Sequence, residues 1–196
     1  MRVPGSMLAD EYFDPSCFEL PAIVKPRMGS GLHGSQLLEQ RSELEQINRD
    51  GSLLVQEHLP GSEYSLNTLA RSDGRVIAVV PWARSIAGAE IAVTGTKRGQ
   101  ELGAIGRLVA RLIGLSSMAN IKVKEAADGR PALLAINPGF AGMMPLMTVE
   151  GGLNMPEFCV EDVLDSPLPA DVAAGSRPSM ARHWWSDRTA EGVVDG

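Results

Sequence analysis

Short apolar runs alternate with polar turns along most of this chain, and this pattern predicts several strands. Two pairs of runs flank the dipeptides Asp73-Gly74 and Asp128-Gly129, which are strong β-hairpin signals because glycine and aspartate suit tight turns. The expected strands are 22–25, 53–55, 63–71, 75–82, 119–126 and 131–137. Antiparallel hairpins are therefore expected to form most of the structure.

Apolar residues at helical spacing predict helices at about 35–49, 99–114 and 155–164. Leu37, Leu38, Leu44 and Ile47 would form one face of the first helix. Leu102, Ile105, Val109, Leu112 and Ile113 would form the buried stripe of the second. Hairpins followed by helices indicate an α+β protein with antiparallel sheets and helices packed on one side, and they disfavour a Rossmann fold, which needs βαβ alternation.

The chain has 196 residues, which is enough for a core of ordinary size. A formal net charge of -6 gives no support to binding of nucleic acid. The two cysteines form no disulfide framework and fit a reducing, cytoplasmic compartment. No apolar run reaches the roughly 20 residues of a membrane span, so no contact with a membrane is expected.

The segment Lys25–Gly34, KPRMGSGLHG, is the strongest chemical signal. Lysine and a glycine-rich loop follow directly on a predicted buried strand. Glycines let backbone N–H groups approach a phosphate closely, and the lysine adds a positive charge. The spacing matches neither the P-loop nor the dinucleotide fingerprint, so an ordinary turn or linker is an equally simple interpretation of the loop alone.

Three stretches, the first of which overlaps this segment, together resemble an ATP-grasp domain when taken in order: PAIVKPRMGSG, LLVQEHLPGSEYSLNTLARSDGRV and NIKVKEAADGRPALLAINPGF. The similarity covers about residues 20–165 and is greatest to the carbamoyl-phosphate-synthetase-like branch of carboxylate–amine ligases. It implies a small lobe with the glycine loop and a larger antiparallel core. The expected divisions are a lead-in at 1–20, the small lobe at 21–60, the large lobe at 61–165 and a tail at 166–196. Gly5-Ser6 before Met7 also resembles a cloning remnant.

The resemblance implies that ATP or ADP is the cofactor and assigns roles to matching residues. Lys25 corresponds to a lysine on the nucleotide phosphates, Glu63 to an acid near the ribose, and Arg84 to a basic residue facing the triphosphate. The mobile loop over the phosphates would include Gly29, Ser30, Gly31 and Gly34. The segment on the adenine edge would be Gln56, Glu57 and His58.

Simpler interpretations stand beside these assignments. Glu57 and Glu63 fit ordinary solvated charges at strand ends, and Arg84 fits a surface ion pair. Counting outward from Asp73-Gly74 places Glu63 opposite Arg84 when no bulge intervenes. That register favours one shared electrostatic site, and it equally allows a structural ion pair.

The second hairpin departs from the family pattern. Members carry acids there that hold Mg²⁺ between the phosphates, and an arginine that supports the transferred group. This chain has Lys122, Ala135, Asn137 and Gly139 at the corresponding positions. Lys122 and Asn137 stay candidate nucleotide contacts, and Asn137 is the one candidate metal ligand. A plain solvent-facing lysine is the alternative interpretation of Lys122.

Two functions follow from the resemblance. The first is the nucleotide-binding module of an ATP-dependent carboxylate–amine ligase that works through an acyl phosphate, with a partner subunit or a second copy supplying the N-terminal domain that the family places before this module. The second is a catalytically degenerate module that serves as a scaffold or regulatory subunit. Whether the chain is an enzyme is left open by its sequence.

Overall fold

The computed structural model describes residues 1–29, 34–84, 90–92, 96–140, 145, 148–149 and 153–166. The chain forms two compact units: Met1–Gly61 with Lys124–Leu134, and Ser62–Val123 with Ala135–Gly196. None of the helices in these described ranges is long and apolar enough to cross a membrane. Ser30 and Gly31 of the expected loop, and all but the first residue of the expected tail, lie outside the described residues.

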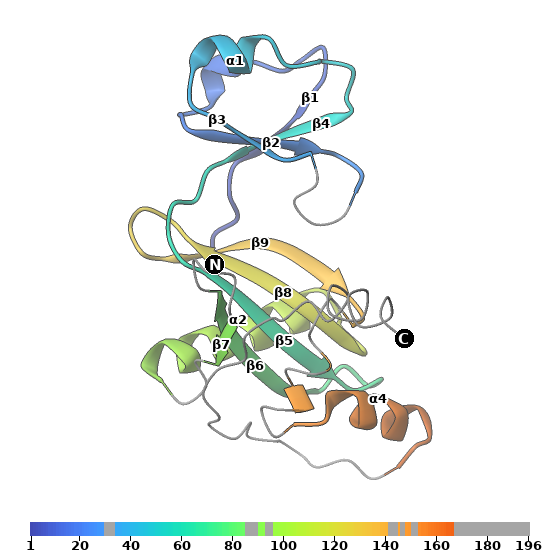
Figure 1. Ribbon diagram of the computed structural model, residues 1–196. Coiled ribbons are helices and arrows are strands. Elements are labelled where there is room, and N and C mark those ends of the chain that lie inside the picture. Colours follow the sequence, from blue (N-terminus) through green and yellow to red (C-terminus); the bar gives the residue numbers. More distant parts are fainter. Residues whose placement is uncertain are drawn as a thin grey trace, which may run out of the picture. The chain divides into compact units, whose positions relative to one another are not determined.

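The first unit contains a four-stranded sheet in the order β1-β4-β2-β3 (Figure 1). Its strands are β1 (Ser6–Ala9), β2 (Ala22–Pro26), β3 (Gln36–Leu38) and β4 (Leu53–Glu57). A 3₁₀ turn, η1 (Pro15–Cys17), and a short helix, α1 (Arg41–Glu45), complete it. Its core contains Ala9, Phe13, Phe18, Ala22, Val24, Leu38, Leu44 and Val55.

The helix expected at 35–49 is wrong over its first part. Residues Gln36–Leu38 form β3, which pairs antiparallel with β2 and places Leu38 in the core and Leu37 in solvent. The helix begins only after Gln40, whose backbone N–H donates to the Glu43 carboxylate at 2.9 Å. Adjacent leucines fit one step of a strand as well as a helical stripe, so local apolar spacing could not decide between them.

Part of the lead-in expected at 1–20 belongs to the first sheet. Strand β1 pairs antiparallel with β4, with Ser6 opposite Gln56 and Ala9 opposite Leu53. Ala9 is fully buried in the core of the first unit. The Arg2 carbonyl also accepts from Leu133 N–H at 2.8 Å. This N-terminal segment therefore supplies the edge strand beside β4, which the sequence pattern did not predict.

The larger sheet has five strands in the order β7-β6-β5-β8-β9 (Figure 1). They are β5 (Glu63–Ala70), β6 (Val76–Arg84), β7 (Glu90–Ala92), β8 (Met118–Glu125) and β9 (Pro131–Pro138). Both expected hairpins are present. The expected fold class, α+β with antiparallel sheets, is confirmed.

Two irregularities in the first hairpin cancel each other. Arg71 N–H donates to the Arg75 carbonyl, so the turn holds three residues instead of two. Ala70 then pairs with Val76 while Leu69 pairs with Ala78, which leaves Ile77 as the extra residue of a bulge. The bulge restores the register that a two-residue turn at Asp73-Gly74 would have given.

Helix α2 (Lys97–Leu112) packs on the larger sheet through a glycine. A Cβ at Gly106 would lie 2.6 Å from Cγ1 of Val79 and 3.4 Å from Oγ1 of Thr68. The helix starts at Thr96, whose hydroxyl accepts from Gly99 N–H at 2.9 Å. Its buried face is Leu102, Gly106, Val109 and Ala110, whereas Leu112 and Ile113, expected on that face, are exposed.

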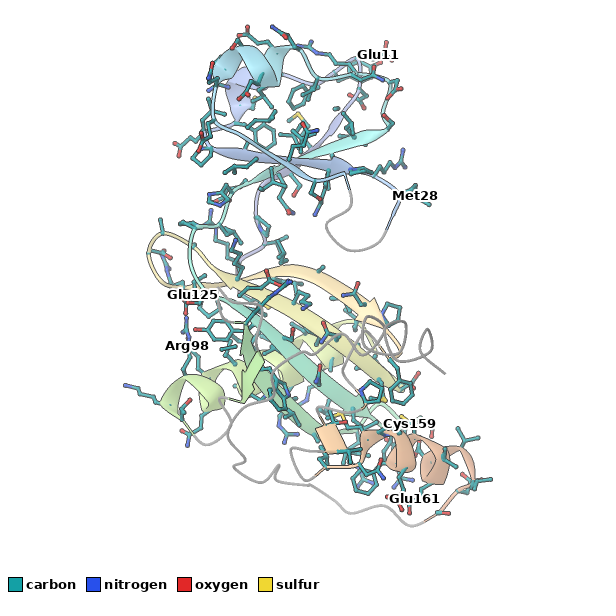
Figure 2. The ribbon with its side chains drawn as sticks, viewed as in Figure 1. Glu11, Met28, Arg98, Glu125, Cys159 and Glu161 are labelled. Atoms are coloured by element: carbon teal, nitrogen blue, oxygen red, sulfur yellow. The ribbon has the colours of Figure 1, made fainter. Side chains whose placement is uncertain are left out.

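Helix α4 (Met155–Val163) also belongs to this unit. Met155 packs with Leu69, Ala78 and Val80, which alternation places on the sheet face opposite Thr68 and Val79. Cys159 of α4 packs against the same apolar cluster (Figure 2). The helices are therefore not confined to one side of the sheet, because α2 and α4 use opposite faces.

The close approach of α2 to the sheet predicts a contrast between two glycines of that helix. Gly106→Ala should lower the free energy of unfolding by about 1–3 kcal/mol, because the added methyl overlaps Val79. Gly103→Ala should raise it by about 0.5–1 kcal/mol, because a Cβ there meets nothing within 4 Å. Urea unfolding of both variants measures the difference, and equal effects would contradict this packing.

Candidate functional site

Lys25 lies near the end of β2 and reaches a neutral partner. Its Nζ donates to Oε1 of Gln56 at 3.0 Å, and Nε2 of Gln56 donates in turn to Oγ of Ser6 at 3.0 Å. Burial lowers the pKa of Lys25 from its ordinary value of 10.5. Among the described residues, no carboxylate forms an ion pair with Lys25. An ammonium oriented by an amide keeps its charge available for an anion.

The described ends of the glycine loop both need glycine. Gly29 and Gly34 have φ values of 147° and 76°, which side-chain-bearing residues rarely adopt. A Cβ at Gly34 would also lie 2.9 Å from Cγ of Pro26. Gly34 therefore packs tightly against Pro26, the residue that follows Lys25 in β2.

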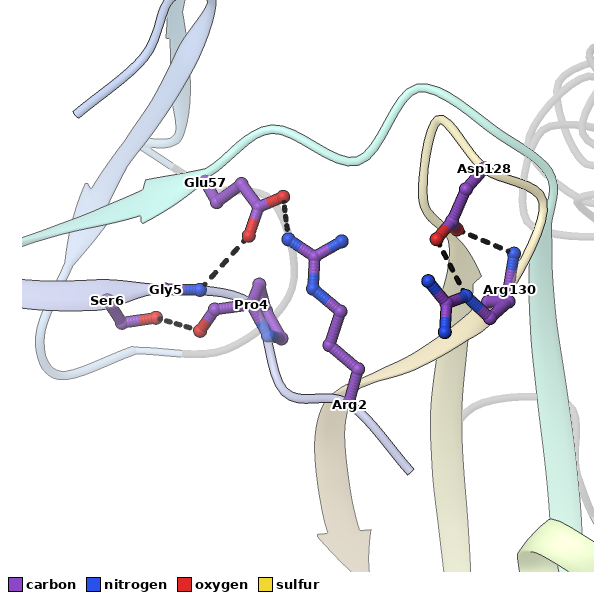
Figure 3. Close-up of polar contacts among 7 residues, drawn as sticks. All are labelled: Arg2, Pro4, Gly5, Ser6, Glu57, Asp128 and Arg130. Atoms are coloured by element: carbon purple, nitrogen blue, oxygen red, sulfur yellow. Dashed lines mark hydrogen bonds and ion pairs between the residues drawn. The ribbon is translucent and has the colours of Figure 1, made fainter.

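Gln56, Glu57 and His58 follow one another at the end of β4 but face different partners. The Glu57 carboxylate forms an ion pair with Arg2 and accepts from Gly5 N–H at 3.2 Å (Figure 3). Its backbone N–H donates to the Gly5 carbonyl at 2.8 Å. The interpretation of Glu57 as a plain solvated charge is therefore wrong.

The hairpin tip in the same close-up is held by its own charges. Asp128 accepts from Arg130 N–H at 3.0 Å and from Arg130 Nε at 2.7 Å (Figure 3). These bonds lower the pKa of the exposed Asp128 carboxyl from its usual value. They fix the turn between β8 and β9.

The surroundings of His58 disfavour its protonated form. Burial and, to a smaller extent, the positive charge of Lys124 lower the pKa of His58 from its usual 6.5. The unfolded chain would accept this proton at a higher pH than the folded chain. The folded state should therefore lose stability as the pH falls below 6.5.

A second polar cluster lies on the larger sheet around Glu63. Oε1 of Glu63 lies 3.5 Å from Nη1 of Arg84 and 3.7 Å from Nζ of Lys122. Nζ of Lys122 also donates to Oγ of Ser65 at 2.6 Å. The side chains of Glu63 and Lys122 are each 23% exposed. Lys122 therefore belongs to a shared electrostatic cluster, and the interpretation as a solvent-facing lysine is wrong.

The expected pairing of Glu63 with Arg84 is confirmed, although a bulge does intervene. Tyr64 pairs with Ala83, so the next residues outward are Glu63 and Arg84. The pairing survives because the three-residue turn and the bulge at Ile77 offset each other. Glu63 is thus held between two cations, and it is not a free acid.

The second hairpin does not keep one register along its whole length. Ala126 N–H donates to the Arg130 carbonyl and Gly139 N–H donates to the Met118 carbonyl at 2.8 Å, and these two pairs differ by one position. Counted from the Gly139 end, Lys122 is expected opposite Ala135. Ala135 and Asn137 are both exposed, as expected for neighbours on one face of β9.

These residues do not fit a magnesium ion. Mg²⁺ needs several oxygen ligands, usually with carboxylates among them. At the corresponding positions the chain has the Lys122 ammonium, which is paired with Glu63, the Ala135 methyl group and the exposed Asn137 amide. Among the described residues, no group of three or more His, Cys, Asp or Glu side chains could hold a metal ion.

Sequence reasoning missed several polar residues beside these clusters. Arg2 and Ser6 lie in the expected lead-in, yet they contact Glu57 and Gln56. Ser65, Asn67 and Asn120 lie inside strands. Their signal was the alternation of polar and apolar residues within 63–67 and 120–122.

One protein-family profile matches more than half of this chain. A family profile described as "ATP-grasp in the biosynthetic pathway with Ter operon" matches residues 49–183. A search of curated proteins found no match.

Several solved structures have a similar fold. Biotin carboxylase from Campylobacter jejuni, in complex with β-γ-ATP, has a TM-score of 0.73 at 16% identity, over 86% of this chain and 44% of that one. N5-carboxyaminoimidazole ribonucleotide synthetase from Thermotoga maritima has a TM-score of 0.65 at 18% identity, over 86% and 46%. L-amino acid ligase from Bacillus licheniformis has a TM-score of 0.61 at 16% identity, over 91% and 47%. This chain spans less than half of each, and the similarity shows the fold alone.

The environment of His58 predicts how its proton affinity responds to Lys124. In Lys124→Gln the pKa of His58 should rise, because a repelling charge is removed, and should stay below 6.5, because burial is the larger cause. Titration by NMR of the His58 ring protons measures both values. A pKa of 6.5 or above in the unchanged chain, or no rise in the variant, would contradict this account.

Proposed function

Because this chain belongs to the ATP-grasp family associated with biosynthetic pathways and the Ter operon, we propose that it is an ATP-binding module of an ATP-dependent carboxylate–amine ligase. In such a ligase ATP phosphorylates a carboxylate, and an amine then attacks the acyl phosphate. The carboxylate and the amine are the substrates proposed here.

The observation that carries the proposal is the environment of Lys25. Its ammonium is half-buried, bonded to the neutral Gln56 amide and followed by a loop whose ends, Gly29 and Gly34, have positive φ. A half-buried charge without an acidic partner is costly unless an anion accompanies it. Phosphate beside Lys25 would relieve that cost.

ATP is proposed as the nucleotide because proteins of similar fold bind it. The Campylobacter jejuni biotin carboxylase structure contains β-γ-ATP, and a carboxyaminoimidazole ribonucleotide synthase structure from Aspergillus clavatus contains ATP. These proteins are 16% and 14% identical to this chain, so the choice of ATP as the probe rests on the shared fold. Gln56 and His58 are proposed neighbours of the adenine.

A second function is favoured by the cluster around Lys122. An ammonium bonded to Ser65 and close to Glu63 stands where the family resemblance expects an acid for Mg²⁺. Gly139 stands where it expects an arginine. These substitutions support a module that binds nucleotide without transferring phosphate at ordinary ligase rates, as a scaffold or regulatory subunit would.

Nucleotide binding should depend on Lys25. In Lys25→Met the dissociation constant for ATP should rise about tenfold or more, because a charge-assisted hydrogen bond is worth about 1.5–3 kcal/mol. Lys97→Met, which removes the same charge from an exposed position on α2, should leave the constant unchanged. Isothermal titration calorimetry on folded variants measures both. Equal constants for all three proteins would refute the role of Lys25.

ATP turnover by this chain should be slow. We expect less than about 1 s⁻¹ with ATP and Mg²⁺, because an arginine on the transferred phosphate can alone contribute about 10³–10⁵ in rate. A coupled ADP assay measures this, and activity that persists in Lys25→Met is ascribed to a contaminant. Turnover above this rate that is lost in Lys25→Met would favour the active ligase over the scaffold.

A further inference from the structure

One face of the larger sheet carries a continuous row of polar side chains. Glu63, Ser65 and Asn67 share this face of β5 because side chains alternate along a strand. Asn120 and Lys122 share it on β8 for the same reason. The bond from Lys122 to Ser65, at 2.6 Å, and the bond from Asn120 to Asn67, at 2.7 Å, join the two strands in successive rungs. The polar row is therefore continuous across the two strands, and Ser65, Asn67 and Asn120 within it are buried.

Part of this polar row has donors and acceptors that form no hydrogen bond with the described residues. Asn67 and Asn120 are 0% and 4% exposed, yet Nδ2 of Asn67 and Oδ1 of Asn120 have no partner there. Turning both amides over would still leave one donor and one acceptor unpaired. Nε1 of Trp82, on the residue opposite Ser65, is also buried and has no partner among the described residues. Buried polar groups are normally satisfied, so a polar ligand is a natural partner for this face.

Two cations meet one carboxylate at the other end of the row. Among the described side chains, Arg84 and Lys122 both lie close to Glu63, and along the backbone Arg84 also pairs with Glu90 of β7. Ser65 and Glu63 hold the Lys122 ammonium in place from two directions. A lysine fixed in this way has less conformational freedom to lose when it meets an anion.

We propose that Lys122 is a built-in cation for the phosphate groups of a nucleoside triphosphate, so that this chain binds the nucleotide without a divalent metal ion. The inference rests on the ATP binding proposed above. An acid at position 122 would repel a phosphate unless a metal ion stood between them. The ammonium removes that repulsion and supplies the attraction itself, with Arg84 as a second donor.

The test compares ATP binding with and without free metal. Calorimetric titrations are run in EDTA and in excess Mg²⁺, on the unchanged chain, on Lys122→Met and on Lys97→Met as the matched loss of charge. The unchanged chain should bind ATP with dissociation constants that agree within about threefold in the two conditions. In EDTA, Lys122→Met should bind about tenfold or more weakly, and Lys97→Met should bind as the unchanged chain does.

Three outcomes would overturn the inference. Binding of ATP only in Mg²⁺ would refute it while the proposed ATP binding survived. An unchanged dissociation constant for Lys122→Met in EDTA would refute it in the same way. Failure of the unchanged chain to bind ATP in either condition would refute the proposed function and the inference together.

A reciprocal variant strengthens the test. Lys122→Glu combined with Ala135→Glu places two carboxylates at positions expected opposite each other across β8 and β9. Its affinity for ATP should be at least about tenfold higher in Mg²⁺ than in EDTA, because the acids now need a cation. A folded double variant without magnesium dependence would contradict the role of position 122. Lys122→Met keeps the proposal testable if the double variant does not fold.

Discussion

The register of β5 against β6 is the constraint on which the polar face depends. A shift of one residue would turn Glu63, Ser65 and Asn67 away from Arg84 and Lys122, because strand side chains alternate. The chain reaches this register through a three-residue turn and a compensating bulge at Ile77. The apolar end of the same face, where Leu69 meets Ala78 and Met118, fixes it further, since a slip would expose that core.

The two lysines of interest have opposite electrostatic settings. Lys25 is bonded to a neutral amide, and burial lowers its pKa, so its charge is costly when no anion is near. Lys122 lies 3.7 Å from the Glu63 carboxylate, which already compensates part of its charge. Lys25 therefore gains more from an incoming phosphate, whereas Lys122 is better held in a fixed position.

Much of the larger sheet could be predicted from its sequence, because each hairpin carries an Asp-Gly signal and a strong apolar pattern. The first unit was harder. Residues 36–38 have no strand signal of their own and become β3 only by pairing with β2. Residues 6–9 join the sheet as β1 because β4 offers them a free edge. Such pairings are tertiary, and local periodicity does not encode them.

For the candidate site, family resemblance supplied Lys25, Glu63 and Arg84, and hairpin counting placed Glu63 opposite Arg84. What could not be predicted was the direction of the long side chains. Lys122 turns toward Ser65 on β5, and Glu57 turns toward Arg2 in the expected lead-in. Rotamers of lysine and glutamate depend on partners distant in sequence, so only the folded chain reveals them.

An ammonium and a magnesium ion differ in what they allow after a nucleotide binds. Mg²⁺ carries two charges and bridges phosphate oxygens during transfer, whereas Lys122 carries one charge, and one of its three donors already serves Ser65. Gly139 has a φ of 80°, so an arginine placed there would also strain the backbone. The proposed site is thus better suited to holding phosphates than to transferring one. Affinity and rate should therefore be separable properties in this chain.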